Sequence, residues 1–157
     1  MNGAAAGLGA TLALLCDVII ADERAVIGDP HVKVGLVAGD GGAVIWPQLV
    51  GYARAKEYLM TGDALTANEA ERIGLINHAV PDAELDARVD AFAKKLAAGA
   101  PQAIKYTKVS VNLALKALAH TILDASMAYE MLTFKTNDHR EAVASFLEKR
   151  KPNFTGN

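Results

Sequence analysis

Two patterns of hydrophobic and polar positions divide this chain of 157 residues. In the N-terminal part, short apolar or β-branched runs alternate with segments of helical spacing, which predicts strands at residues 18–21, 25–27 and 75–80. Helical spacing predicts a buried helix at 10–15 and further helices at 41–50, 53–59, 67–73 and 84–98. From Pro101 onward only helical spacing remains, over 102–117, 122–134 and 139–149. The chain is therefore expected to be α/β, with a helical C-terminal region.

Capping residues, glycine and proline indicate where the predicted helices and turns begin, end or kink. Thr66 followed by Glu69 fits a capping box, with Gly74 as the residue that ends the helix. Pro47 is expected to break or kink the helix at 41–50. The Asp29-Pro30 pair predicts extended or turn geometry directly before His31.

Composition narrows the class of protein. Hydrophobic residues make up 52% of the chain and charged residues 22%, which indicates a globular fold. The net charge of −2 argues against nucleic acid as a partner. The single cysteine, Cys16, excludes a disulfide framework and predicts a cytoplasmic location. No apolar run reaches the length of a membrane span, so no membrane segment is expected.

The first candidate for chemistry is the glycine-spaced segment 2–9, which runs into an apolar helical stretch. Backbone N–H groups in such a loop, at a helix start, can stabilise a developing oxyanion. The alternative is an ordinary tight turn, because glycine also serves there.

The second candidate is the pair His31 and Asp40, nine positions apart. A carboxylate that orients an imidazole makes histidine a base near neutral pH. A working pair requires the two side chains to lie within hydrogen-bond reach, beside the Leu8 N–H, with the pKa of His31 raised. The alternative is that His31 caps a turn and Asp40 caps the helix beginning near Gly41. Asp29, a second carboxylate near His31, is expected to fix the turn at Pro30.

The remaining polar residues predict neither a metal site nor a serine nucleophile. His78, His120 and His139 have no ligand spacing with one another or with Cys16. Serines without a Gly-x-Ser-x-Gly context, Ser110 and Ser126, do not form a nucleophile elbow.

Several motifs in order resemble the crotonase superfamily, the enoyl-CoA hydratase/isomerase group. They are the loop at 2–9, Gly28-Asp29-Pro30-His31, Gly39-Asp40-Gly41-Gly42, Trp46-Pro47 and the tail from Phe146 to Phe154. The resemblance implies a crotonase-like ββα-spiral fold whose first strands are missing from this sequence. Residues 1–98 would form the C-terminal part of the spiral core, and 99–157 a helical trimerisation region that also covers the active site. It also implies an acyl-CoA thioester substrate, no prosthetic group, no metal, and a homotrimer or dimer of trimers.

The resemblance also assigns roles to single residues. Hydratases of the family act through two glutamates, but Thr11 and His31 stand at those positions, so low conventional hydratase activity is expected. Leu8 takes the place of one oxyanion donor, while the other donor belongs to the missing segment. Phe146 and Lys149 match the tail residues that approach the coenzyme A of a neighbouring subunit. The alternative for this tail is a solvated basic helix end.

Two other functions remain open at this point. The His31–Asp40 pattern also resembles 6-oxocamphor hydrolase, a crotonase relative that uses a His–Asp pair to activate water against a carbon–carbon bond between two carbonyls. That resemblance implies a hydrolase acting on a β-diketone or β-keto thioester. The other alternative is an inactive truncated paralogue or an oligomerisation partner, because the first strands and both glutamates are missing.

Overall fold

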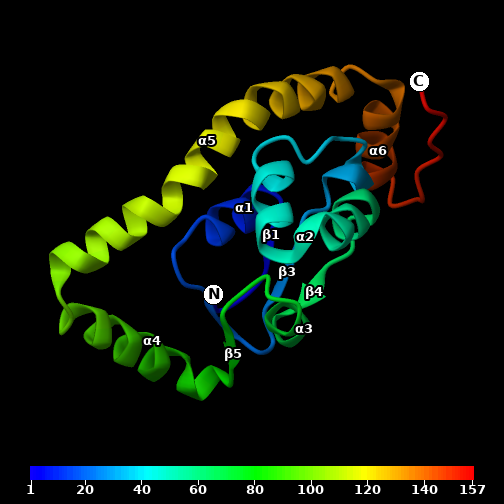
Figure 1. Cartoon of the computed structure of the whole chain (residues 1–157). Helices are drawn as coiled ribbons and strands as arrows, with labels where there is room; N and C mark the ends of the chain where they lie inside the picture. Colours follow the sequence, from blue (N-terminus) through cyan, green and yellow to red (C-terminus); the bar gives the residue numbers. More distant parts are fainter.

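The computed structural model describes all 157 residues, with two small sheets at its centre (Figure 1). In the first sheet, β1 (Ala5–Ala6) pairs in parallel with β3 (Val26–Gly28), and β3 pairs antiparallel with β4 (Leu65–Thr66). In the second sheet, β2 (Ile20–Asp22) pairs in parallel with β5 (His78–Val80). Parallel neighbours require crossover connections, and the helices between these strands provide them.

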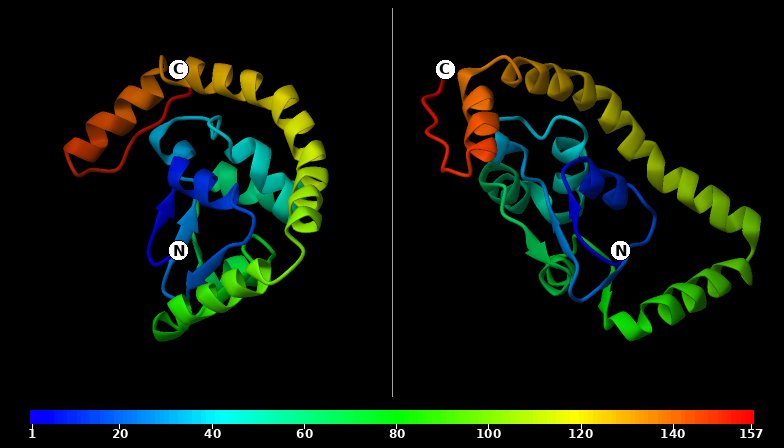
Figure 2. Two further views of the ribbon diagram at one scale, coloured as in Figure 1. Left: turned by 90° about the vertical axis from the view of Figure 1, so that its left-hand side faces the viewer. Right: turned by 180° about the vertical axis from the view of Figure 1, so that it is seen from behind.

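The helices surround these sheets and then extend away from them. They are α1 (Leu8–Leu14), the 3₁₀ helix η1 (His31–Val34), α2 (Gly42–Thr61), α3 (Ala67–Arg72), α4 (Asp82–Ala97), α5 (Pro101–Thr133) and α6 (Asn137–Leu147). With 33 residues, α5 is about 50 Å long. It arches past α1 and α2, and the C-terminal tail returns beside α6 (Figure 2). No helix combines the length and the apolar character needed to cross a bilayer.

The apolar core lies between the sheets, α1, α2 and α3. Ala10, Ile27 and Trp46 are fully buried there, and the Trp46 ring centroid is 6.0 Å from that of Tyr58. This packing holds β3 and the beginning of α2 against each other. The loop between these two elements is therefore anchored at both ends.

The predicted short strands and most helices are present, with shifted ends, but three details were wrong. Helix α1 is half-exposed and not buried: Leu12 is 61% exposed, because only one face of this two-turn helix meets the core. The helix continues through Pro47 without a break; it kinks at Gly51, where φ is 79°, between the two helices predicted at 41–50 and 53–59. Only residues 78–80 of the predicted strand at 75–80 pair with another strand.

The C-terminal region also differs from its prediction. Two predicted helices, 102–117 and 122–134, form the single helix α5. The residues between them include neither glycine nor proline, and nothing interrupts the helical backbone. The Thr66 cap is confirmed, because the Glu69 N–H donates to Thr66 Oγ1 at 3.3 Å, but the Glu69 carboxylate pairs with Arg72 and does not complete the capping box.

Candidate active site

The predicted pair lies on the segment that joins β3 to α2. His31 opens η1 directly after Asp29-Pro30, and Gly35 ends η1 in the left-handed conformation, with φ of 69°. Asp40 lies two residues before α2 begins. One loop therefore carries both side chains, and its two ends are fixed by the core.

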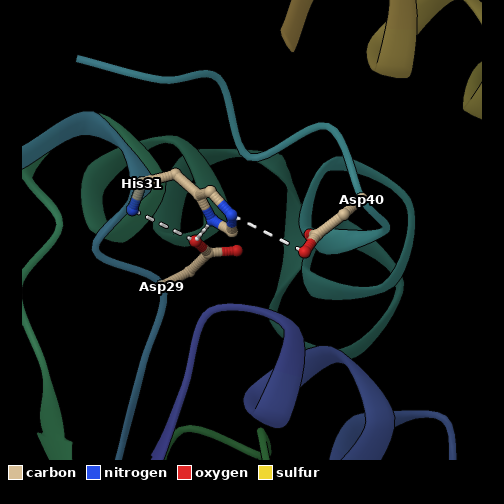
Figure 3. Close-up of side chains that lie close together, drawn as sticks. All are labelled: Asp29, His31 and Asp40. Carbon is tan, nitrogen blue, oxygen red and sulfur yellow. Dashed lines mark hydrogen bonds and ion pairs between the residues drawn. The ribbon is translucent and has the colours of Figure 1, made fainter. Parts of the chain in front are cut away.

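The His31 ring lies between two carboxylates (Figure 3). Its Nδ1 contacts Asp29 Oδ1, and its Nε2 is 3.6 Å from Asp40 Oδ2. The Asp29 contact fixes the ring orientation, whereas the Asp40 distance is that of an ion pair and is too long for a direct hydrogen bond. The predicted proximity of His31 and Asp40 is observed, and whether they act together remains a proposal.

Neither carboxylate is a simple cap. Helix α2 has Gly41 as its N-cap residue and no side-chain hydrogen bond there, so the capping interpretation of Asp40 is wrong. Asp29 Oδ1 accepts a long bond from the His31 backbone N–H at 3.4 Å as well as contacting the ring. Asp29 thus fixes the turn, as expected, and also orients the imidazole.

A further carboxylate, Glu130, reaches the cluster from α5. Its Oε2 lies 2.8 Å from the position that a Cβ on Gly39 would occupy. Sequence analysis missed this residue, because 99 positions separate it from His31. Its i, i+4, i+7 spacing with Ser126 and Thr133 is a polar stripe that a search for facing residues on α5 would have found.

The charges of this cluster shift two pKa values upward. The pKa of His31 is raised, mainly by its hydrogen bond to Asp29 and further by the charges of Asp29, Asp40 and Glu130, while burial opposes the shift. Burial raises the pKa of Glu130, and the charges of Asp40 and Asp29 add to this, against the opposing charge of His31. No lysine or arginine pairs with these carboxylates. His31 and Glu130 therefore hold their protons more tightly than the same side chains do in water.

The glycine loop lies against the same histidine. Gly7 precedes α1 with φ of 54°, and a Cβ placed on it would lie 3.3 Å from His31 Cε1. The next residue, Leu8, is the first of α1, so its N–H has no partner inside the helix. Thr11 is buried one turn further on, with its methyl group against Gly41. The structure thus brings together His31, Asp40, Leu8 and Thr11.

Buried polar atoms without partners concentrate here. Four such side-chain atoms occur in the chain, and three belong to this cluster: Thr11 Oγ1, Asp29 Oδ2 and Asp40 Oδ1. Buried polar groups are normally hydrogen-bonded, so such a concentration is typical of a site for a polar ligand. Asp29, His31 and Asp40 also offer ligand atoms within 4.8 Å of one another, a geometry that can hold a cation.

The predicted coenzyme A residues lie elsewhere. Phe146, on α6, is 81% exposed, and Lys149 follows that helix with φ of 55°. Neither side chain has a hydrogen bond or ion pair to the His31 cluster. A largely apolar cavity of about 450 Å³ borders the site loop at Val32 and Ala38, with Lys56 and Met60 of α2 opposite.

Known proteins resemble this chain in sequence and in fold. The sequence model described as "Enoyl-CoA hydratase/isomerase" matches residues 1–157. A crotonyl-CoA hydratase of Syntrophomonas wolfei is 39% identical over 98% of this chain and 59% of its own length. An enoyl-CoA hydratase structure from Mycobacterium avium subsp. paratuberculosis superposes with a TM-score of 0.91 at 33% identity, covering 98% of this chain and 63% of that one. A carnitinyl-CoA hydratase structure from Mycobacterium avium gives 0.89 at 32%, covering 99% and 61%.

The chain therefore spans about three fifths of the length of these relatives. Their structures confirm the predicted crotonase-like α/β fold with a helical C-terminal region. Because the family match extends from the glycine loop at the first residues to the tail after α6, the chain belongs to the enoyl-CoA hydratase/isomerase family.

Proposed function

We propose that this chain binds an acyl-CoA thioester and that His31 exchanges protons with it, as part of an enzyme of the hydratase/isomerase type. The observation that carries the proposal is the His31 ring, placed between Asp29 and Asp40 and against the glycine before Leu8. The crotonyl-CoA and carnitinyl-CoA hydratases among the relatives support the substrate class.

The proposed chemistry starts from the thioester carbonyl. The Leu8 N–H donates to its oxygen and stabilises the enolate that forms when a nucleophile adds to the β-carbon or a proton leaves the α-carbon. Neutral His31 accepts the proton from water, and Asp29 stabilises the imidazolium that results. For hydration, hydroxide adds to the β-carbon and a proton returns to the α-carbon, so all atoms of the water are accounted for.

The binding of the rest of the substrate is part of the proposal. The apolar cavity beside Val32 and Ala38 has a volume suited to an acyl group. Exposed Phe146 and Lys149 suit stacking on adenine and pairing with a phosphate. Because both side chains are exposed in the single chain, they are free to contact coenzyme A bound by a neighbouring subunit. The proposal therefore includes a homotrimer or dimer of trimers. A cytoplasmic location belongs to the same proposal.

The test compares acyl-CoA hydration by the unaltered chain with that by His31→Gln and Asp40→Asn variants. General acid–base catalysis contributes about 10²–10⁴-fold, so His31→Gln should lower kcat by at least about 10²-fold while CoA-thioester binding, measured by calorimetry, persists. His120→Gln, an exposed histidine on α5, is the matched control. Equal kcat values for the unaltered chain and His31→Gln would refute the proposal.

A second candidate, a carbon–carbon bond hydrolase, is supported by the His31 ring lying between Asp29 and Asp40. The resemblance adds the implication that Thr11 and His31 stand at the positions of the family's two glutamates. In this reaction His31 would activate water against the carbonyl of a β-diketone or β-keto thioester. Hydrolysis of such a substrate without hydration of crotonyl-CoA would select this candidate. Absence of both activities, with retained assembly, would support the alternative of an inactive paralogue or oligomerisation partner.

A further inference from the structure

The loop that carries His31 and Asp40 has few hydrogen bonds of its own. Between Leu36 and Asp40, its one internal backbone bond runs from the Gly39 N–H to the Val37 carbonyl. The Val34 carbonyl, the Val37 N–H and the Gly39 carbonyl have no backbone partner. A loop of this kind does not fix the separation of two side chains without outside support.

Three side chains of the C-terminal helices provide that support. Ser126 Oγ donates to the Gly39 carbonyl at 2.8 Å, and Thr133 Oγ1 accepts from the Val37 N–H at 3.2 Å. On α6, the His139 ring donates through Nδ1 to the Val34 carbonyl at 2.8 Å. The three bonds occupy three backbone groups of the loop that have no backbone partner.

Close backbone approach accompanies these bonds. A Cβ on Gly39 would lie 2.4 Å from the Ser126 carbonyl oxygen, and one on Gly35 would lie 2.9 Å from the His139 backbone nitrogen. Side chains are excluded at both positions, so α5 and α6 contact the loop directly at its middle and at the end of η1. Glu130, which lies one turn after Ser126 on α5, also approaches Gly39: its Oε2 would lie 2.8 Å from a Cβ there.

We propose that Ser126, Thr133 and His139 are positioning residues that hold the loop in the geometry in which His31 lies between Asp29 and Asp40. We call the three hydrogen bonds from Ser126, Thr133 and His139 to the loop the clamp. The inference rests on the proposed function of His31, whereas the clamp can be tested without it. The helical C-terminal region would then control the active histidine of its own chain, in addition to any role in assembly.

The test measures the clamp directly by NMR on the full chain. Thr133→Val and Ser126→Ala each remove one hydroxyl, and Thr133→Ser is the conservative variant that retains it. Thr121→Val and Ser110→Ala are matched controls, because both residues lie on α5 and their hydroxyls bond only to their own helix. Gly39→Ala separates α5 from the loop by steric contact, without removing any hydroxyl.

The expected result has two parts. Amide exchange at Val37 becomes faster in Thr133→Val and Gly39→Ala, and the titration midpoint of His31 falls toward its ordinary value in both variants and in Ser126→Ala. Thr133→Ser and the controls keep the midpoint of the unaltered chain. On an active enzyme, the loss appears in kcat at constant KM, by about 10²-fold for a displacement near 1 Å.

An unchanged His31 midpoint in Thr133→Val, Ser126→Ala and Gly39→Ala would overturn the proposal. If Ser126→Ala does not fold, Thr133→Val decides the test, because Thr133 is only half-buried and its replacement disturbs the packing less. An inactive chain that still shows the exchange and titration changes would refute the proposed function and leave the clamp intact.

Discussion

Replacing Gly42 with alanine tests the packing that holds Asp29 against His31. Gly42 is buried at the beginning of α2, and a Cβ there would lie 2.2 Å from Asp29 Oδ2 and 3.1 Å from Ala38 Cβ. In an open helix the same change stabilises the fold, because glycine is about 0.5–1 kcal/mol less favourable than alanine. Two effects of opposite sign therefore meet at this position.

The steric effect is expected to win. Asp29 is 1% exposed, so its carboxylate cannot turn into solvent to avoid the new methyl group. Overpacking of this kind costs about 1–3 kcal/mol, which leaves a net loss of about 1–2 kcal/mol after the helical gain. At about 2–4 °C per kcal/mol for a chain of this size, Tm should fall by roughly 2–8 °C.

Urea and thermal denaturation, followed by circular dichroism, measure the effect. Gly9→Ala is the matched control: Gly9 also lies in the first turn of a helix, and a Cβ there meets nothing within 4 Å. The control should be neutral or more stable by up to about 1 kcal/mol. If Gly42→Ala were as stable as Gly9→Ala, the proposed packing of Asp29 would be wrong.

Three further predictions concern the site and one cap. Asp29→Asn should lower the pKa of His31, measured by NMR titration. Because the pKa of His31 in the folded chain lies above the ordinary 6.5, protonated His31 stabilises the fold fully below pH 6.5, and this stabilisation is lost as the pH rises through the folded pKa. The variant should therefore reduce the pH dependence of the free energy of unfolding. Glu130→Gln raises Tm at pH 7 but not at pH 4, because a raised carboxyl pKa means that the charged form costs stability only above it. Thr66→Ala costs about 1 kcal/mol in urea denaturation, through loss of the bond from the Glu69 N–H; an unchanged midpoint would show that the cap contributes nothing.

Local interactions explain which parts of the fold could be predicted. The cap of α3 depends on Thr66 and Glu69, which are three positions apart, and the structure has the bond from the Glu69 N–H to Thr66 Oγ1 as expected. The break at Gly51 could be predicted, because glycine adopts a φ of 79° without strain and lies between the helices predicted at 41–50 and 53–59. Pro47, by contrast, does not interrupt the helix, although it lacks the N–H of a helical residue. The continuity of α5 agrees with residues 118–121, which include neither glycine nor proline.

The same distinction applies to the site: some of its residues could be predicted from the sequence and others could not. His31 and Asp40 share one loop, so their proximity could be inferred from the chain. Asp29 was expected mainly to fix the turn at Pro30, but it also contacts the His31 ring, because the rotamer of His31 turns Nδ1 toward it. Glu130 comes from a helix whose path past the loop is set by tertiary packing, and no sequence spacing fixes that path. Residues on one element are predictable together, whereas residues from separate elements need the fold.

The charges of the cluster limit what His31 can do at each pH. The charges of Asp29, Asp40 and Glu130 act on the His31 ring without a lysine or arginine to balance them, and they raise its pKa. The raised pKa shifts the balance toward the imidazolium, so the free base becomes abundant only at a higher pH than for an imidazole in water. A reaction in which His31 removes a proton therefore gains rate as pH rises through that pKa, whereas one in which it donates a proton loses rate. Because Asp29 stabilises the charged ring most, the same contact that orients His31 also sets the pH at which its two roles exchange.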